Sequence, residues 1–199
     1  MNIPKTLILI RFCFAPIILA LAYFYGEQSV LCILILMYVG LLTDIFDGVI
    51  ARKQNSSNQN LRRLDSQTDL IFWLSIGFAT WLLRSDLLRE NLLGIYTIVI
   101  MEALCYVISL LKFKKETCTH AILSKFWGIT LLVAFTALLG FKTAGIYFYS
   151  CVIVGFIAHL DVILIILLLP KWTHDVPSSY HAYLLRKGID IKRNKLFNR

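Results

Sequence analysis

The chain has 199 residues, of which 58% are hydrophobic and 16% charged, and its mean hydropathy is +0.73. A soluble domain of ordinary composition is about a quarter charged, so these values exclude such a domain and indicate one membrane domain over nearly the whole chain. The formal net charge of +8 would by itself fit a nucleic-acid-binding protein, a class that the placement of the basic residues argues against.

Apolar runs of about 20 residues, the length that crosses a membrane as a helix, recur six times along the chain. They are continuous rather than alternating, which favours helices over strands. We therefore predict an all-α, multi-pass integral membrane protein with a six-helix membrane domain over residues 1–170 and a basic tail over residues 171–199. The expected spans, in chain order, are residues 6–25, 29–52, 64–83, 91–113, 119–141 and 144–169.

Lysine and arginine are enriched in cytoplasmic loops, which gives the expected orientation. With the N-terminus inside, the outer face receives only Arg84, Arg89 and Lys142. The inner face receives the tail's basic residues together with Lys5, Arg52, Lys53, Arg62, Arg63, Lys112, Lys114 and Lys115. Both termini are therefore expected in the cytoplasm, and the basic residues are expected to contact anionic lipid headgroups rather than nucleic acid.

Four aspartates form the sharpest motif in the chain. Asp44 and Asp47 lie near the inner end of the second predicted span, and Asp65 and Asp69 lie near the inner end of the third. At 100° per residue, each pair shares one face of its helix, and Gly48 lies on the same face as the first pair. Antiparallel packing of the two helices brings the four carboxylates to one depth, within reach of water.

Such a cluster is costly unless its charge is offset, because like charges repel and burial penalises each carboxylate. A hard divalent cation with oxygen ligands, Mg²⁺ or Mn²⁺, is the natural counter-ion. Gly48 and Ala51 indicate that a bulky group approaches the helix backbone, and Arg52 is placed to hold a phosphate or a carboxylate. The alternative is a set of solvated helix-end charges paired with neighbouring arginines and lysines.

The run from Asp44 to Asp69 resembles the signature of the CDP-alcohol phosphotransferases, D-x2-D-G-x2-A-R-x8-G-x3-D-x3-D. It departs from that signature only at Leu61, where the family has glycine. The opening Asn2-Ile3-Pro4, with Arg11 and Pro16, resembles that of phosphatidylglycerophosphate synthases. Six spans also fit the family. In the family the glycine lets the helix lie close to the cytidine nucleotide, so Leu61 is expected to reshape that pocket.

The resemblance implies an enzyme that transfers a phosphatidyl group from a CDP-linked lipid to a small alcohol and releases CMP, with its active site facing the cytoplasm. Two ions, Mg²⁺ or Mn²⁺, would be held by all four aspartates, and Asp69 would be the catalytic general base. The family also implies a homodimer. The residues that would line the pocket for the CDP donor are Asp44, Gly48, Ala51, Arg52 and Asp65.

The acceptor stays open between glycerol 3-phosphate, inositol phosphate, serine and other alcohols. Arg11 and Lys125 lie about two turns inside their spans, so they either bind the phosphate of an anionic acceptor, snorkel to the interface, or pair with buried acids. Glu102, His159 and Asp161 lie nearer mid-membrane, where pairing between helices is expected. The five scattered cysteines are interpreted as unpaired packing residues.

Two rival functions remain. Acids inside a membrane also mark the pathways of divalent-cation or proton-coupled transporters, but such acids are spread through the membrane, whereas these four lie at one face. A catalytically silent scaffold would keep the fold without the chemistry, and the intact set of aspartates argues against it.

Overall fold

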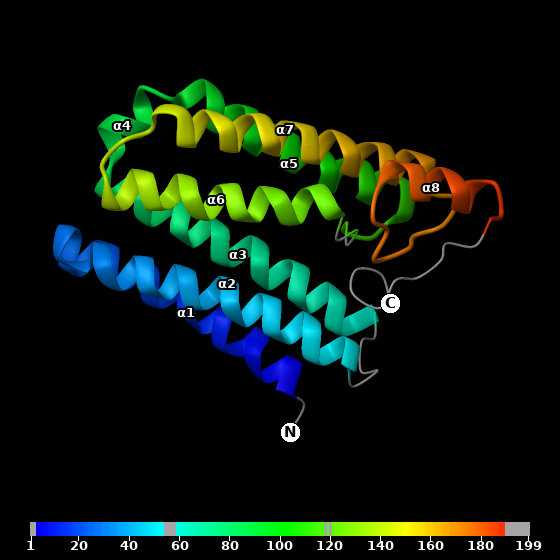
Figure 1. Ribbon diagram of the computed structural model, residues 1–199, viewed down its shortest axis with the longest axis horizontal. Helices are drawn as coiled ribbons and strands as arrows, with labels where there is room; N and C mark the ends of the chain where they lie inside the picture. Colours follow the sequence, from blue (N-terminus) through cyan, green and yellow to red (C-terminus); the bar gives the residue numbers. More distant parts are fainter. Residues whose placement is uncertain (1–2, 54–58, 118, 120, 190–199) are drawn as a thin grey trace. The chain divides into compact units, whose positions relative to one another are not determined.

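The computed structural model describes residues 3–53, 59–117, 119 and 121–189, apart from the side chains of residues 51–53 and 59. Throughout these ranges every regular element is a helix (Figure 1), which confirms the all-α prediction. In chain order the elements are α1 (Ile3–Tyr25), the 3-10 helix η1 (Gly26–Ser29), α2 (Val30–Lys53), α3 (Gln59–Leu83), α4 (Ser85–Arg89), α5 (Leu92–Phe113), α6 (Ile122–Gly140), α7 (Gly145–Leu168) and α8 (Ser179–Arg186).

Four stretches of the described chain are long and apolar enough to cross a membrane, namely Ile3–Ile50, Leu92–Phe113, Ile122–Gly140 and Gly145–Leu168. The first of them contains α1 and most of α2. Helix α3 is not among the four, because charged residues occupy its first half and leave an uncharged part shorter than about 20 residues. The six-span count and the orientation of the termini therefore stay predictions.

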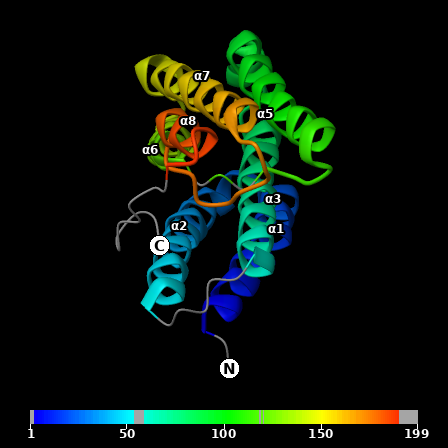
Figure 2. The ribbon, with the colours of Figure 1, turned by 90° about the vertical axis from the view of Figure 1, so that its right-hand side faces the viewer.

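One compact unit comprises Met1–Asn91 together with Leu132–Phe148. Within it α1 packs against both α2 and α3. Figures 1 and 2 show that the start of α1, the end of α2 and the start of α3 lie at the same end of this bundle. Its apolar core is formed by buried side chains from α1, α2, α3 and the second half of α6, and includes Ile18, Ile33, Met37, Phe72, Ile76 and Leu139.

The side chain of Phe72 on α3 reaches the backbone of α2 at Gly40, one turn before Asp44. A Cβ added at Gly40 would lie 2.2 Å from Cζ of Phe72, whose ring is almost fully buried. Phe72 follows Asp69 by three residues on α3. The ring therefore fits against the bare backbone of Gly40, next to the aspartates, where a side chain on α2 would leave no room for it.

Gly40→Ala is expected to lower the free energy of unfolding by about 1–3 kcal/mol, because the new methyl group overpacks against Phe72. Replacing the ring by a shorter side chain, in the double variant Gly40→Ala/Phe72→Leu, should recover part of the lost stability. Gly77→Ala is the matched control on α3, since its nearest neighbour would lie at 3.9 Å, and it should be neutral or stabilising. Unfolding in detergent measures all three; equal stability of the two alanine variants would contradict the close contact.

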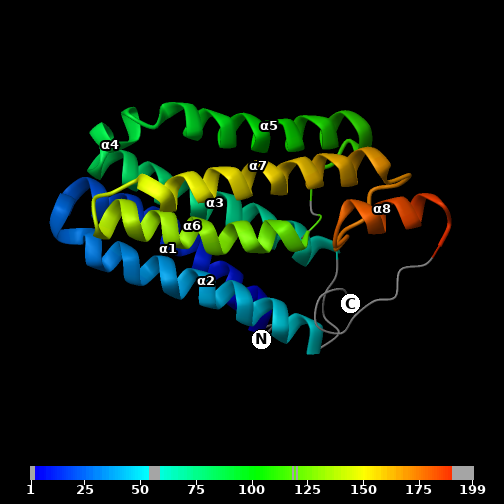
Figure 3. The same ribbon diagram turned by 45° about the horizontal axis from the view of Figure 1, so that its top comes forward.

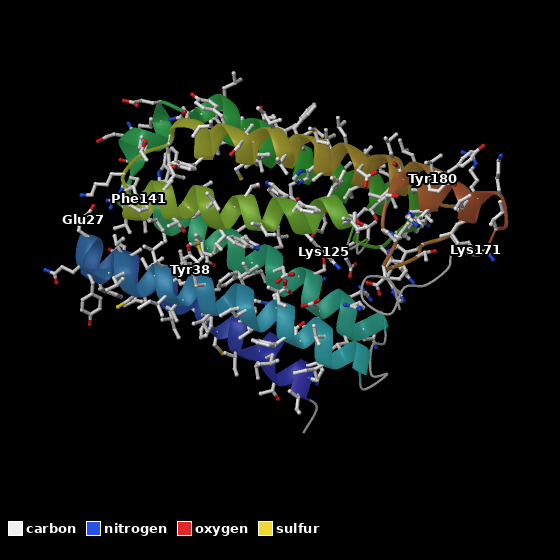
Figure 4. The ribbon with its side chains drawn as sticks, in the orientation of Figure 1. Glu27, Tyr38, Lys125, Phe141, Lys171 and Tyr180 are labelled. Atoms are coloured by element: carbon white, nitrogen blue, oxygen red, sulfur yellow. The ribbon has the colours of Figure 1, made fainter. Side chains whose placement is uncertain are left out.

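The opposite end of the same unit is held by Arg84, which lies just after α3 and is 8% exposed. Its guanidinium donates to the carbonyl oxygens of Leu138 (3.3 Å) and Leu139 (2.9 Å) in the last turn of α6, and to both carboxylate oxygens of Glu27 in η1. Figure 4 shows Glu27 and Phe141 at this end. One side chain thus ties together the ends of three elements.

The other compact unit comprises Leu92–Leu131 and Tyr149–Arg199. Its core joins α5, α7 and α8 through Cys105, Val162, Ile165, Ile166, Leu169, Val176 and Ala182. Helix α8 lies beside the end of α7 (Figure 3). The buried carboxylate of Asp161 on α7 accepts a 3.0 Å hydrogen bond from the backbone N–H of Ser179 and so caps α8. Part of the predicted tail is therefore folded against this unit.

Glu102 and His159 pair between helices, as the sequence predicts. Nε2 of His159 on α7 lies 2.6 Å from Oε2 of Glu102 on α5, and its Nδ1 lies 2.5 Å from the carbonyl oxygen of Gly155. Both ring nitrogens are thus satisfied, which fits a packing role. The described cysteines are free thiols, as predicted; Cys118 lies outside the described residues.

Candidate active site

The four aspartates are brought together by α2 and α3. Asp44 and Asp47 lie on α2, and Asp65 and Asp69 lie on α3, all near the end of the bundle where α1 begins. Carboxylate oxygens of Asp44, Asp47 and Asp65 lie within 4.8 Å of one another. Residues three or four apart share a helix face, so two short sequence pairs become one cluster when the helices pack side by side.

The centre of this cluster is the guanidinium of Arg11 on α1, whose side chain is 1% exposed. Nη1 lies 2.7 Å from Asp44 and Nε lies 3.1 Å from Asp69. Nη2 donates to Asp65 at 2.5 Å and lies 3.3 Å from Asp47. Each of the three nitrogens thus faces a carboxylate, and one cation is shared among four anions.

Burial divides the aspartates into two kinds. The side chains of Asp47 and Asp65 are 3% and 8% exposed, whereas those of Asp44 and Asp69 are 35% and 30% exposed. Each helix therefore supplies one carboxylate that is enclosed and one that meets solvent. The accessible pair can exchange protons with bound substrate or water, which suits the role predicted for Asp69 as a base.

The chemistry of this donor set fits divalent metal ions. Four carboxylates against one guanidinium leave a formal excess of three negative charges among these groups. Clustered carboxylate oxygens are the ligands that Mg²⁺ and Mn²⁺ prefer. Arg11 alone offsets only part of the repulsion, so the residues present favour additional cations at this cluster.

A small, partly open pocket lies beside the buried aspartates. Gly48 and Leu61 both line it. Leu61 is 9% exposed and packs against Ile8. The full lining is Pro4, Ile8, Asp47, Gly48, Leu61, Arg62 and Asp65. The residue that departs from the signature, Leu61, therefore forms an apolar wall of a pocket whose charged lining is Asp47, Arg62 and Asp65.

The other predicted site residues are Ala51, Arg52, Lys125 and Arg11. The side chains of Ala51 and Arg52 lie outside the described residues. Lys125 is exposed on the part of α6 that belongs to the other compact unit. Arg11 contacts the aspartates, the arrangement that the sequence left open as pairing with buried acids, and its binding to an acceptor phosphate stays a prediction.

Three lining residues were not anticipated from the sequence, namely Pro4, Ile8 and Arg62. Arg62 is buried. Because it lies between Leu61 and Asp65 in the signature, its position in the sequence could have indicated a place in the pocket. Pro4 and Ile8 lie one turn apart on α1, about two turns and one turn before Arg11. Only the packing of α1 on the other two helices places them here.

The model of the family described as CDP-alcohol phosphatidyltransferase matches residues 1–170. A relative from Aquifex aeolicus (strain VF5), named CDP-diacylglycerol--glycerol-3-phosphate 3-phosphatidyltransferase, is 39% identical over 72 residues. That match covers 36% of this chain and spans only 39% of the relative's length. No solved structure matches the chain. The match over residues 1–170, with the aspartate signature gathered at one centre, shows that this chain belongs to the CDP-alcohol phosphatidyltransferase family.

Proposed function

We propose that the protein transfers the phosphatidyl group of CDP-diacylglycerol to glycerol 3-phosphate and releases CMP, as a step of phospholipid synthesis. The observation that carries this proposal is the gathering of all four signature aspartates around one centre beside a pocket. Family membership supports the reaction class. The name of the Aquifex relative supports the acceptor, over the stretch that the two proteins share.

The position of the cluster suits a lipid donor. The aspartates lie near the ends of helices whose remaining length is apolar. A CDP-linked lipid has its acyl chains in the bilayer and its pyrophosphate at the interface. A carboxylate cluster at the end of apolar helices can therefore meet the pyrophosphate, through bound cations, while the acyl chains stay in hydrocarbon.

The proposed step is a displacement at the phosphorus that carries the diacylglycerol. The accessible carboxylate of Asp69 accepts the proton of the acceptor hydroxyl. The acceptor oxygen then forms a bond to that phosphorus, the bond from phosphorus to the bridging oxygen breaks, and CMP leaves with the electron pair. Gly48 lets the donor approach the backbone of α2, and the roles predicted for Ala51 and Arg52 in the same pocket are part of the proposal.

Two Mg²⁺ or Mn²⁺ ions, held by Asp44, Asp47, Asp65 and Asp69, would supply Lewis-acid stabilisation of charge on the pyrophosphate and the leaving CMP. The finer topology is also part of the proposal: six spans, both termini and the active site at the cytoplasmic face, and a homodimer. The apolar helices and the family together indicate an integral membrane protein.

The acceptor assignment predicts an effect at Lys125. This cation lies in an otherwise apolar helix, and a charge-assisted contact to phosphate is worth about 1.5–3 kcal/mol. Lys125→Ala should therefore raise the KM for glycerol 3-phosphate roughly tenfold to a hundredfold, with the KM for the donor nearly unchanged. Steady-state kinetics with each substrate varied in turn measures both values. An unaltered acceptor KM would remove Lys125 from the acceptor site.

Leu61 predicts an effect on the donor. Leu61→Gly opens the pocket wall and should retain transfer, with a donor KM equal to or below that of the wild type. Leu64→Gly is the matched control, because Leu64 is exposed on the same helix and carries the same helix-propensity cost of about 1 kcal/mol. A wild-type protein that ignores cytidine donors, together with a Leu61→Gly variant that accepts them, would show the donor assignment to be wrong.

The experiment that tests the function is incubation of the purified protein with CDP-diacylglycerol, Mg²⁺ or Mn²⁺, and a panel of glycerol 3-phosphate, inositol phosphate, serine and glycerol. CMP release and the lipid product are measured together. We expect turnover with glycerol 3-phosphate. Turnover with a different alcohol would change the acceptor alone, and no CMP release with any of them would overturn the proposal.

A further inference from the structure

Arg11 places a permanent positive charge at the centre of the aspartate cluster. Its three nitrogens lie 2.5–3.3 Å from carboxylate oxygens of all four aspartates. The side chain is almost completely enclosed, so solvent screens it little. A guanidinium is not deprotonated in proteins, so this charge is present under every condition in which the protein is folded.

The same carboxylates are the ligands proposed for divalent ions. Any cation bound by them lies within a few ångströms of the guanidinium, where two positive charges in an enclosed site repel strongly. Two divalent ions would turn the formal excess of three negative charges into an excess of one positive charge. Without Arg11, the charges of the four carboxylates and the two ions would balance. Arg62 is buried beside Asp47 and adds a further positive charge, so Arg11 deepens the surplus of positive charge in a fully loaded site.

We propose that Arg11 is a built-in counter-charge that weakens divalent-ion binding until the negatively charged pyrophosphate of the donor offsets it. This inference rests on the proposed function, because it takes the donor to be a CDP-linked lipid. Ion and donor then bind tightly only together, and by linkage each strengthens the other's affinity by the same factor. Ions that bind without a donor are held loosely.

A purely geometric role for Arg11 predicts the opposite change in metal affinity. If the guanidinium only holds the carboxylates in place, removing it disorders the ligands and weakens metal binding. If its charge opposes the ions, removing that charge tightens metal binding. The sign of the change therefore separates the two roles.

The test is Mn²⁺ binding to the purified full-length protein, followed by the electron paramagnetic resonance signal of free Mn²⁺, with and without CDP. The variants are Arg11→Gln, which removes the charge, and Arg11→Lys, which keeps it. The matched control is Lys5→Gln, which removes an exposed cation from the same helix. Thermal unfolding of each variant in the presence of Mn²⁺ establishes which of them are folded.

We expect Arg11→Gln to bind Mn²⁺ alone about tenfold more tightly than the wild type, or more, and to respond less to CDP. Arg11→Lys and Lys5→Gln should match the wild type, in which CDP strengthens Mn²⁺ binding. Equal or weaker Mn²⁺ binding by folded Arg11→Gln would overturn the proposal.

If Arg11→Gln does not fold, Arg11→Lys separates the two roles, because lysine keeps the positive charge but lacks the planar guanidinium that holds the carboxylates. An Mn²⁺ affinity of Arg11→Lys equal to that of the wild type supports the proposal, and a tenfold loss of Mn²⁺ affinity overturns it. CDP that leaves the Mn²⁺ affinity of the wild type unchanged overturns the coupling to the donor. The metal-alone titrations do not involve transfer, so a protein that shows the Arg11 effect but no CMP release contradicts the proposed function and not the counter-charge.

Discussion

Asp65→Asn is expected to abolish transfer, lowering kcat/KM by about three orders of magnitude or more. Asp65 is buried at the cluster, and its carboxylate is one of the three whose oxygens lie within 4.8 Å of one another. The amide keeps the shape of the side chain but loses the negative charge that a hard cation requires. Loss of Lewis-acid stabilisation worth several kcal/mol corresponds to this fall in rate.

Removal of divalent ions from the wild type by a chelator should have the same effect, and added Mn²⁺ or Mg²⁺ should restore the wild type but not Asp65→Asn. Asp86→Asn is the control, because Asp86 is an exposed carboxylate on α4, outside the cluster. It should retain full activity. CMP release and the thermal unfolding midpoint are measured for each protein. Full activity of the wild type in excess chelator would contradict the metal-dependent reaction.

Arg84→Met should cause a large loss of stability in the unit that contains α1, α2 and α3. The change leaves the carbonyl oxygens of Leu138 and Leu139 without their donor and removes the cation that pairs with Glu27. Leaving a buried acceptor without its donor costs about 1–3 kcal/mol, whereas Glu27 is exposed and can be solvated. We therefore expect the free energy of unfolding to fall by about that amount, measured by denaturant titration in detergent.

Lys142→Met provides the matched comparison, because Lys142 pairs with the same Glu27 at 3.3 Å but is 64% exposed. A surface ion pair is worth about 0–1 kcal/mol, so this variant should unfold close to the wild type. Equal stabilities of the two methionine variants would show that the buried contacts of Arg84 do not stabilise the unit. Both substitutions lie at the end of the unit opposite the aspartates, so neither should alter Mn²⁺ affinity.

Features that depend on one helix at a time could be predicted from the sequence. The apolar runs predict the helices, because a backbone in hydrocarbon must satisfy its hydrogen bonds within the segment. The spacing of Asp44 and Asp47, and of Asp65 and Asp69, predicts two carboxylate pairs, because residues three or four apart share a helix face. The chemistry of clustered carboxylates then predicts the class of ion.

Contacts between helices required the tertiary structure. Periodicity says which face of a helix is polar, but the rotation and height at which helices meet depend on side-chain packing across the whole interface. The sequence therefore left Arg11 between three roles, and only the packing of α1 on α2 and α3 directs its guanidinium to all four aspartates. The contact of Gly40 with Phe72 follows from the same packing.

Helix α8 also combines features that the sequence predicts with a contact that only the tertiary structure shows. Its basic residues predict a cytoplasmic tail that contacts lipid headgroups, and its outward side chains, including Tyr180 (Figure 4), are exposed. Its anchor is the carboxylate of Asp161, eighteen residues earlier on α7. A buried carboxylate needs a donor, and the sequence shows that need without showing which N–H will meet it. Tertiary packing brings the chain after α7 back against that helix, and the N–H of Ser179 becomes the donor.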